Sequence, residues 1–279
     1  MQRKTTLFLG IVIVFITLME LSAGYAEKAD AGKSKPHYTI VTSDTILSSM
    51  AAALLPPDRY TVEAILPPGQ CPGHYDVKLS DIEKIKKADL IVVFRGMPFL
   101  NQADMNGRTQ LFVDTDGRNW MAPDSYIYGL NRLADALSLR FPIDRNEISK
   151  RKEAASHQVT KEANRLKNQT RRAGFAGKTI IASALQKEPL EWMGFRVVGE
   201  YDRPEAMSAK DVVRLLQTGR DRRVVAVVDN LQSGPDTGKS IAETLGRPHV
   251  VLTSFPTDRG YLATLKENVN TVLAVVINK

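Results

Sequence analysis

Residues 146–173 read NEISKRKEAASHQVTKEANRLKNQTRRA, and this stretch decides how the chain is organised. It contains no glycine or proline, and its apolar residues trace one narrow stripe at helical spacing: Ile148, Ala155, Val159 and Leu166. The other residues are polar, and basic ones outnumber acidic ones. We therefore predict one long, largely solvated helix over residues 146–173 that links two halves of the chain. The following basic residues are interpreted as helix surface and not as a binding patch: Lys150, Arg151, Lys152, Arg171 and Arg172.

On both sides of this helix, short apolar runs alternate with amphipathic stretches, which is typical of parallel sheets flanked by helices. Four strands are predicted before it, at 38–41, 61–66, 88–94 and 111–113, and four after it, at 179–183, 195–199, 224–229 and 249–252. The remaining helices are predicted at 43–54, 80–87, 125–140, 208–217, 237–245 and 261–275. The fold class is therefore α/β: two lobes, each with a mostly parallel four-stranded sheet, joined by one long rigid helix. The lobes are expected at residues 37–145 and 174–279.

Length and composition agree with two compact units. The chain has 279 residues, about twice the size of a common domain, with 43% hydrophobic and 25% charged residues. These values exclude a membrane bundle and wholesale disorder. The formal net charge of +7 is modest, and no aromatic residues are interleaved with the basic stretch, so nucleic-acid binding is not supported.

The N-terminal segment predicts export. Arg3 and Lys4 precede an apolar run over residues 7–18, and Gly24 and Ala26 are the small residues that signal peptidase requires at −3 and −1. The run is short for a membrane span. We predict that residues 1–26 are a signal peptide and that the mature protein is a periplasmic or otherwise exported monomer. The alternative is an uncleaved N-terminal anchor.

Two α/β lobes joined by a single helix leave a cleft, and ligands of such sheets gather at the carboxyl ends of the strands. This rule selects residues 67–74, 114–120, 183–184, 229–230 and 253–259. We therefore expect the functional residues to lie in these segments.

The most distinctive of these segments is Cys71-Pro72-Gly73-His74, which follows a predicted strand. A thiolate and an imidazole three residues apart can hold one transition-metal ion, such as zinc, copper(I) or iron, from a tight turn. Two ligands are half of a site, however. The alternative is that Cys71 is buried and His74 makes local hydrogen bonds. Because Cys71 is the only cysteine, it cannot form an internal disulfide.

Motifs of common enzymes are absent from the sequence. It contains neither H-E-x-x-H nor G-x-S-x-G, so we predict no enzymatic activity. Residues 233–240 have the setting of a phosphate-binding loop, but Ser233 stands where that loop requires glycine and Pro235 removes a backbone donor. An ordinary strand-to-helix turn is expected there.

Two stretches carry a family resemblance. Residues 67–94, with Cys-Pro-Gly-His-Tyr-Asp at 71–76, and residues 116–123, Asp-Gly-Arg-Asn-Trp-Met-Ala-Pro, resemble the zinc- and manganese-binding solute receptors of bacterial ABC transporters. The resemblance extends from about Tyr38 to the end and includes the long linking helix. It implies a metal held between two lobes by histidines and carboxylates, and delivery to an ABC permease at the membrane. The metal implied is a transition ion, one of zinc, manganese, iron, copper or cobalt.

The chain departs from that family at nearly every ligand position. Gly73 stands where the first histidine is expected, Arg118 where the second is, and Ser183 where the third is. Asp229 fits a later acidic position and Ser254 that of a final aspartate, with Arg259 nearby. A guanidinium at a ligand position would repel a dication, so an unmodified three-histidine zinc site is not expected.

The resulting hypothesis is an exported solute-binding protein that captures a metal ion or metal-containing ligand between its lobes for an ABC importer. Three versions stay open. The first is a metal held by Cys71, His74 and Asp229. The second is a metal chelate or anion whose charge meets Arg118 and Arg259, and the third is a receptor-like protein without solute binding. A thiol-based redox protein using Cys71 is the competing class.

Overall fold

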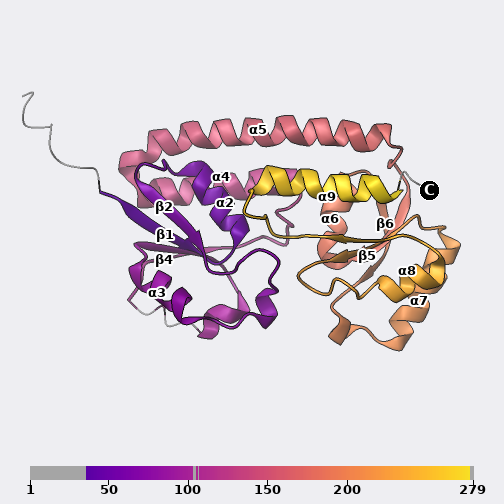
Figure 1. The fold of residues 1–279 in the computed structure, drawn as a ribbon. Helices are drawn as coiled ribbons and strands as arrows, with labels where there is room; N and C mark the ends of the chain where they lie inside the picture. Colours follow the sequence, from indigo (N-terminus) through magenta and orange to yellow (C-terminus); the bar gives the residue numbers. More distant parts are fainter. Residues whose placement is uncertain (1–35, 103–104, 106, 277–279) are drawn as a thin grey trace, which may run out of the picture. The chain divides into compact units, whose positions relative to one another are not determined.

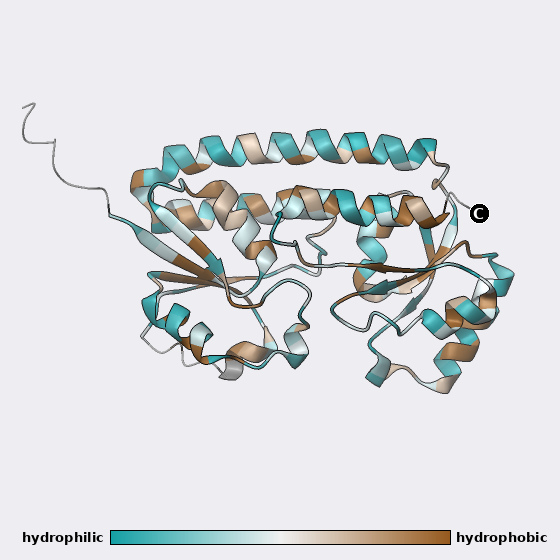
Figure 2. Cartoon of the chain, viewed as in Figure 1, coloured by the Kyte–Doolittle hydropathy of each residue, from teal (hydrophilic) through white to brown (hydrophobic). Residues whose placement is uncertain are grey.

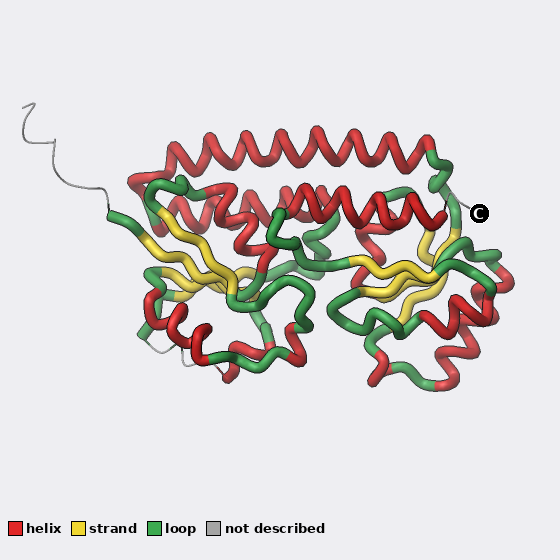
Figure 3. Tube along the Cα trace, in the orientation of Figure 1, coloured by secondary structure: helices red, strands yellow, loops and turns green. Residues whose placement is uncertain are grey.

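Two four-stranded sheets carry the fold (Figures 1 and 3). The computed structural model describes residues 36–102, 105 and 107–276; the predicted signal peptide lies outside them. The first sheet has the order β2-β1-β3-β4 and contains β1 (Tyr38–Thr42), β2 (Tyr60–Ala64), β3 (Leu90–Phe94) and β4 (Gln110–Val113). The second has the order β6-β5-β7-β8 and contains β5 (Thr179–Ser183), β6 (Arg196–Tyr201), β7 (Val227–Asn230) and β8 (His249–Leu252). All neighbours are parallel, so the predicted fold class is confirmed.

Helices cover both faces of each sheet. In the first lobe they are α2 (Thr45–Leu54), α3 (Leu79–Lys87) and α4 (Pro123–Arg140). In the second they are α6 (Lys187–Trp192), α7 (Ala209–Asp221), α8 (Lys239–Leu245) and α9 (Tyr261–Val276). The six-residue α6 is absent from the sequence prediction; the other helices agree with it to within a few residues. None of the helices in the described part of the chain combines the length and apolar character needed to cross a membrane.

The long helix α5 (Arg145–Arg172) joins the two lobes. It is unbroken over 28 residues, about 42 Å at the usual rise per residue. Its buried side chains include Ile148, Val159 and Leu166, and Ala155 packs beside them, so the predicted apolar stripe is confirmed. Its other faces are hydrophilic (Figure 2). Helix α5 contacts α2 and α4 of the first lobe and α9 of the second.

Alternate residues of each strand face opposite sides of their sheet. On the side of α5, one continuous apolar cluster contains Ile40 of β1 and Ile180 of β5, together with Leu166 of the long helix. Each sheet has a separate, smaller cluster on its other face, where Val41 packs in the first lobe and Ile181 in the second. The shared cluster connects the cores of the two lobes and reaches the strand ends at Phe94, Val113 and Leu252.

Asp44 caps the N-terminus of α2 from a fully buried position. One carboxylate oxygen accepts the N–H groups of Ile46 and Leu47 at 2.9 and 3.1 Å, and the other accepts the Ser43 hydroxyl at 2.6 Å. These bonds favour the ionised form, but burial outweighs them and raises the pKa of Asp44 from 3.8 to about 6. The Asp44 carboxyl therefore keeps its proton up to about pH 6 in the folded protein, whereas in the unfolded chain it loses the proton near pH 3.8.

This shift predicts a pH-dependent loss of stability. Because the folded pKa lies above the unfolded value, the contribution of Asp44 is greatest below about pH 4 and is lost as the pH rises through about 6, a change of about 3 kcal/mol. We expect Asp44→Asn to remove this dependence, since asparagine caps helices equally well and does not ionise. Denaturant unfolding of both proteins from pH 4 to 7.5 measures it. The exposed Asp58→Asn is the control, and parallel curves for wild type and Asp44→Asn would contradict the shift.

Candidate functional site

A cavity of about 720 Å³ lies at the carboxyl ends of strands from both sheets. Segments that follow each of the four strands of the first lobe line one side, and segments after β5, β6, β7 and β8 of the second line the other. Six large apolar side chains form much of its wall: Ile46, Phe94, Met97, Trp120, Leu185 and Phe255. The position agrees with the rule that ligands gather at strand ends in open α/β sheets. The cavity is large enough for an organic molecule.

The charged lining is predominantly basic. Four cationic side chains and two carboxylates line the cavity: Arg95, Arg118, Lys187 and Arg203, with Glu188 and Glu191. Arg95 is paired with Asp114 at 3.0 Å, and Lys187 with Glu200 at 2.7 Å. Arg118 and Arg203 have no ion-pair partner among the residues that the structure describes. Two guanidinium groups are therefore available to an anion.

The two arginines come from different lobes. Arg118 follows β4, and its guanidinium lies 4.4 Å from the ring centroid of Tyr128, a cation–π contact. Arg203 follows β6 and reaches the turn Pro72–His74 of the first lobe. Its Nη1 lies 2.5 Å from the place where a Cβ of residue 73 would stand. The glycine at this position therefore makes room for the guanidinium.

Glu188 of α6 links the lobes beside the cavity. One carboxylate oxygen accepts the N–H of Asn119 at 2.6 Å, and the other accepts the hydroxyl of Ser125 at the start of α4. The Asn119 side chain also donates to the carbonyl of Leu185. The Glu188 carboxylate is thus already engaged in hydrogen bonds.

A cluster of amides and hydroxyls forms the floor of the cavity in the second lobe: Asn230, Ser233 and Ser254 line it, and Gln186 is hydrogen-bonded to Asn230 and Ser254. The hydroxyl of Ser254 donates to Asn230 Oδ1 at 2.6 Å, and Gln186 Nε2 donates to the same oxygen at 2.8 Å. Asn230 Nδ2 in turn donates to the Ser233 hydroxyl at 3.0 Å. Gln186 and Asn230 are fully buried. These groups are neutral, so the formal charge of the site comes from the arginines, the lysine and the glutamates.

Some of the predicted ligand-binding residues line the cavity and others do not. Arg118 and Ser254 both line the cavity. Ser183 ends β5 and is buried, and it is the next residue, Ala184, that lines the cavity. Arg259 is exposed, pairs with Glu267 of α9 and lines a separate groove. Ligand contact by Ser183 and Arg259 stays a prediction.

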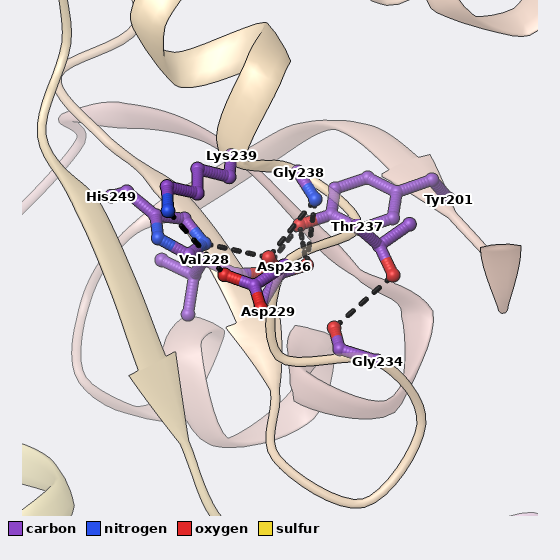
Figure 4. Close-up of polar contacts among 9 residues, drawn as sticks. All are labelled: Tyr201, Val228, Asp229, Gly234, Asp236, Thr237, Gly238, Lys239 and His249. Carbon is purple, nitrogen blue, oxygen red and sulfur yellow. Dashed lines mark hydrogen bonds and ion pairs between the residues drawn. The ribbon is translucent and has the colours of Figure 1, made fainter.

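Asp229 is fully buried, and Figure 4 shows its polar contacts within the second lobe. Its carboxylate accepts the Tyr201 hydroxyl at 2.6 Å and the N–H of Gly238 at 2.9 and 3.0 Å, and it lies 2.6 Å from Nε2 of His249. Burial and the nearby carboxylate raise the pKa of Tyr201, which keeps the hydroxyl a donor. Asp229 thereby closes the loop between β7 and α8, which carries Ser233 to the cavity. A contact between Asp229 and the solute stays a prediction.

Cys71 and His74 bracket the short turn Pro72–His74. Cys71 is half-buried and His74 is exposed, whereas Pro72 between them lines the cavity. Within the described ranges, no three histidine, cysteine, aspartate or glutamate side chains come close enough together to hold a metal ion. Metal binding by this pair therefore stays a prediction, and the described residues offer it no third protein ligand.

Sequence reasoning missed Arg203, Lys187 and Glu188. The prediction ended the sixth strand at Gly199, whereas β6 continues to Tyr201 and brings Arg203 to the strand end. Lys187 and Glu188 belong to α6, the helix that was not predicted. A correct strand end would have selected Arg203 by the rule that selected the other segments.

Two parallel sheets of equivalent strand order, a single linking helix and a cavity lined by both lobes define the class of two-lobed solute-binding proteins. Residues 40–275 match the family described as "ZnuA: Zinc-uptake complex component A periplasmic", and the chain belongs to this family. The predicted resemblance is thereby confirmed.

Solved structures share the fold at low sequence identity. The laminin-binding protein Lmb of Streptococcus agalactiae, described as having adhesin and metal-transporting activity, is 14% identical with a TM-score of 0.70. The periplasmic zinc-binding protein TroA of Treponema pallidum is 15% identical with a TM-score of 0.68. A manganese-bound periplasmic metal-binding protein of Candidatus Liberibacter asiaticus is 15% identical with a TM-score of 0.72. Each match covers 86% of this chain and 99% of the other.

A similarity in sequence covers a smaller region. The chain is 30% identical over 80 residues to the uncharacterized protein RP014 of Rickettsia prowazekii. These residues are 29% of this chain and span only 24% of that protein.

Proposed function

We propose that this protein is an exported solute-binding receptor that captures a metal ion or metal-containing ligand in the cavity between its lobes and presents it to an ABC permease. The observation that carries the proposal is the cavity of about 720 Å³ lined by strand ends of both lobes. A solute there contacts both lobes at once, which is how a receptor can couple binding to a change in the surface it offers a permease. Membership of the zinc-uptake family supports a metal as the solute, and the titles of the zinc- and manganese-binding neighbours agree.

The competing class, a thiol redox protein, has no comparable support. Cys71 precedes a single 3₁₀ turn of three residues and not the N-terminus of an α-helix. The arrangement that activates thiols in oxidoreductases places the sulfur at such a helix terminus. A receptor that binds and releases a solute, without catalysis, accounts for the cavity and its lining.

The test is the metal content of the protein purified from its native exported compartment. We expect a stoichiometric transition metal by elemental analysis, and loss of that metal when the protein is unfolded and dialysed. Arg214→Gln, on the surface of α7, serves as the control and is expected to retain the metal. Loss of the metal from Cys71→Ser or His74→Ala would place it at the turn that these residues bracket. Protein that carries no transition metal in any preparation would contradict the proposed function.

A further inference from the structure

The size of the cavity argues against a bare ion. It measures about 720 Å³, whereas one water molecule occupies about 30 Å³ of liquid. Pockets for organic molecules range over about 300–1,000 Å³. An ion alone would leave most of this volume to water.

The donors in the cavity lead to the same conclusion. Among the residues that the structure describes, Glu188 and Glu191 are the only carboxylates in its lining, and no histidine or cysteine lines it. Glu188 already accepts hydrogen bonds from Asn119 and Ser125. A metal that enters this cavity must therefore bring most of its own ligands.

The charges select the sign of the ligand. Arg118 and Arg203 lack ion-pair partners in the described part of the chain, whereas Arg95 is paired with Asp114 and Lys187 with Glu200. The two unpaired guanidinium groups attract a carboxylate, which a planar guanidinium can bind through two parallel hydrogen bonds. Because the two arginines belong to different lobes, a ligand with several carboxylates can bind both.

The apolar wall supplies a surface for a carbon skeleton. Phe94, Trp120, Leu185 and Phe255 line the cavity beside the arginines. Burying this apolar surface against organic groups stabilises a complex, whereas a hydrated ion buries no apolar surface. A small carboxylate-bearing molecule has both properties that the lining fits.

We propose that the metal enters this cavity already bound to a carboxylate-bearing organic chelator, as an anionic complex whose free carboxylate oxygens are bound by Arg118 and Arg203. This inference rests on the proposed function and specifies its solute. Gly73 is part of the arrangement, because a side chain there would displace the Arg203 guanidinium. The family resemblance implies histidines at positions 73 and 118. In this chain Arg118 occupies the second position, and the Arg203 guanidinium fills the space beside Gly73 at the first.

Titration calorimetry on metal-free full-length mature protein tests the inference. The probes are the citrate and nitrilotriacetate complexes of iron(III) and zinc, free zinc chloride, and each chelator alone. We expect at least one complex to bind more tightly than free zinc and than its own chelator. Arg118→Gln and Arg203→Gln are each expected to weaken that binding by about 10- to 100-fold, the usual range for a lost charge-assisted hydrogen bond. Gly73→Ala should weaken it in the same direction, and Arg214→Gln, on the surface of α7, should leave it unchanged.

The outcomes separate this inference from the proposed function. Free zinc that binds at least as tightly as every complex, with no effect of the arginine variants, would overturn the chelate and leave a metal receptor. A chelator that binds equally well without metal would also overturn it, as would failure of every complex to bind. The metal content of the native protein decides the proposed function independently of these titrations.

Discussion

Asp144→Ala is expected to lower the free energy of unfolding by about 3–5 kcal/mol, because it leaves a buried guanidinium without its counter-charge. Asp144 immediately precedes α5, and Arg59 immediately precedes β2. Their side chains form an ion pair and are only 8% and 6% exposed. The second carboxylate oxygen accepts the Tyr60 hydroxyl at 2.5 Å. The pair thus fastens the start of the linking helix to the first sheet.

The same residue does not act as a helix cap. Asp144 is the residue before the first turn of α5, yet its side chain makes no capping hydrogen bond. Burial, with the Asp144 hydrogen bond as the next cause, raises the pKa of Tyr60 and keeps its hydroxyl protonated. The expected loss of stability therefore comes from the unpaired Arg59 guanidinium and the unpaired Tyr60 hydroxyl, and not from the loss of a cap on α5.

Denaturant unfolding of the full chain measures the effect. The double variant Arg59→Met with Asp144→Leu should recover much of the loss, since well-packed apolar residues often replace a buried ion pair at little cost. Glu162→Ala, which breaks the more exposed pair with Arg165 on α5, should cost less than about 1 kcal/mol. A cost for Asp144→Ala no larger than that of Glu162→Ala would contradict the role assigned to the pair.

The fold could be predicted from the sequence because its elements follow local periodicities. The stripe of α5 and the apolar runs of β3 and β5 are long or regular enough to be read without knowledge of their partners. Helix α6 could not be predicted in this way. It has only six residues and contains Pro189, so it is shorter than the two turns over which a helical period becomes visible. Its position is set by packing against β6.

The site was predicted in part because the strand-end rule is also local. It selects Arg118 and Ser254, which line the cavity. The meeting of Arg203 with Gly73 joins residues 130 positions apart, and no periodicity reports such a contact. The sequence also does not show which arginines have an ion-pair partner. Of Arg118 and Arg259, only Arg259 is paired with a carboxylate, that of Glu267, in the described structure.

Asp229→Ala is expected to lower the free energy of unfolding by about 4 kcal/mol, because it leaves buried donors without an acceptor. The donors come from three elements around the carboxylate: Tyr201 of β6, Gly238 at the start of α8, and His249 of β8. The Tyr201 hydroxyl retains the carbonyl of Val228 at 3.0 Å, so its loss is partial. The amide of Gly238 keeps no such alternative in the described hydrogen bonds.

Asp229→Asn should cost less than the alanine variant, since its amide oxygen can still accept from Tyr201 and Gly238. The exposed Asp236→Ala, in the same loop, should change stability by no more than about 0.5 kcal/mol. Denaturant unfolding gives the free energy of unfolding of the three variants, and titration with iron(III) citrate gives the affinity of their cavity. Because the loop that Asp229 closes carries Ser233 and follows Asn230 in the cavity floor, affinity should fall in the same order as stability. Full stability in Asp229→Ala would show that the loop holds its shape without the carboxylate.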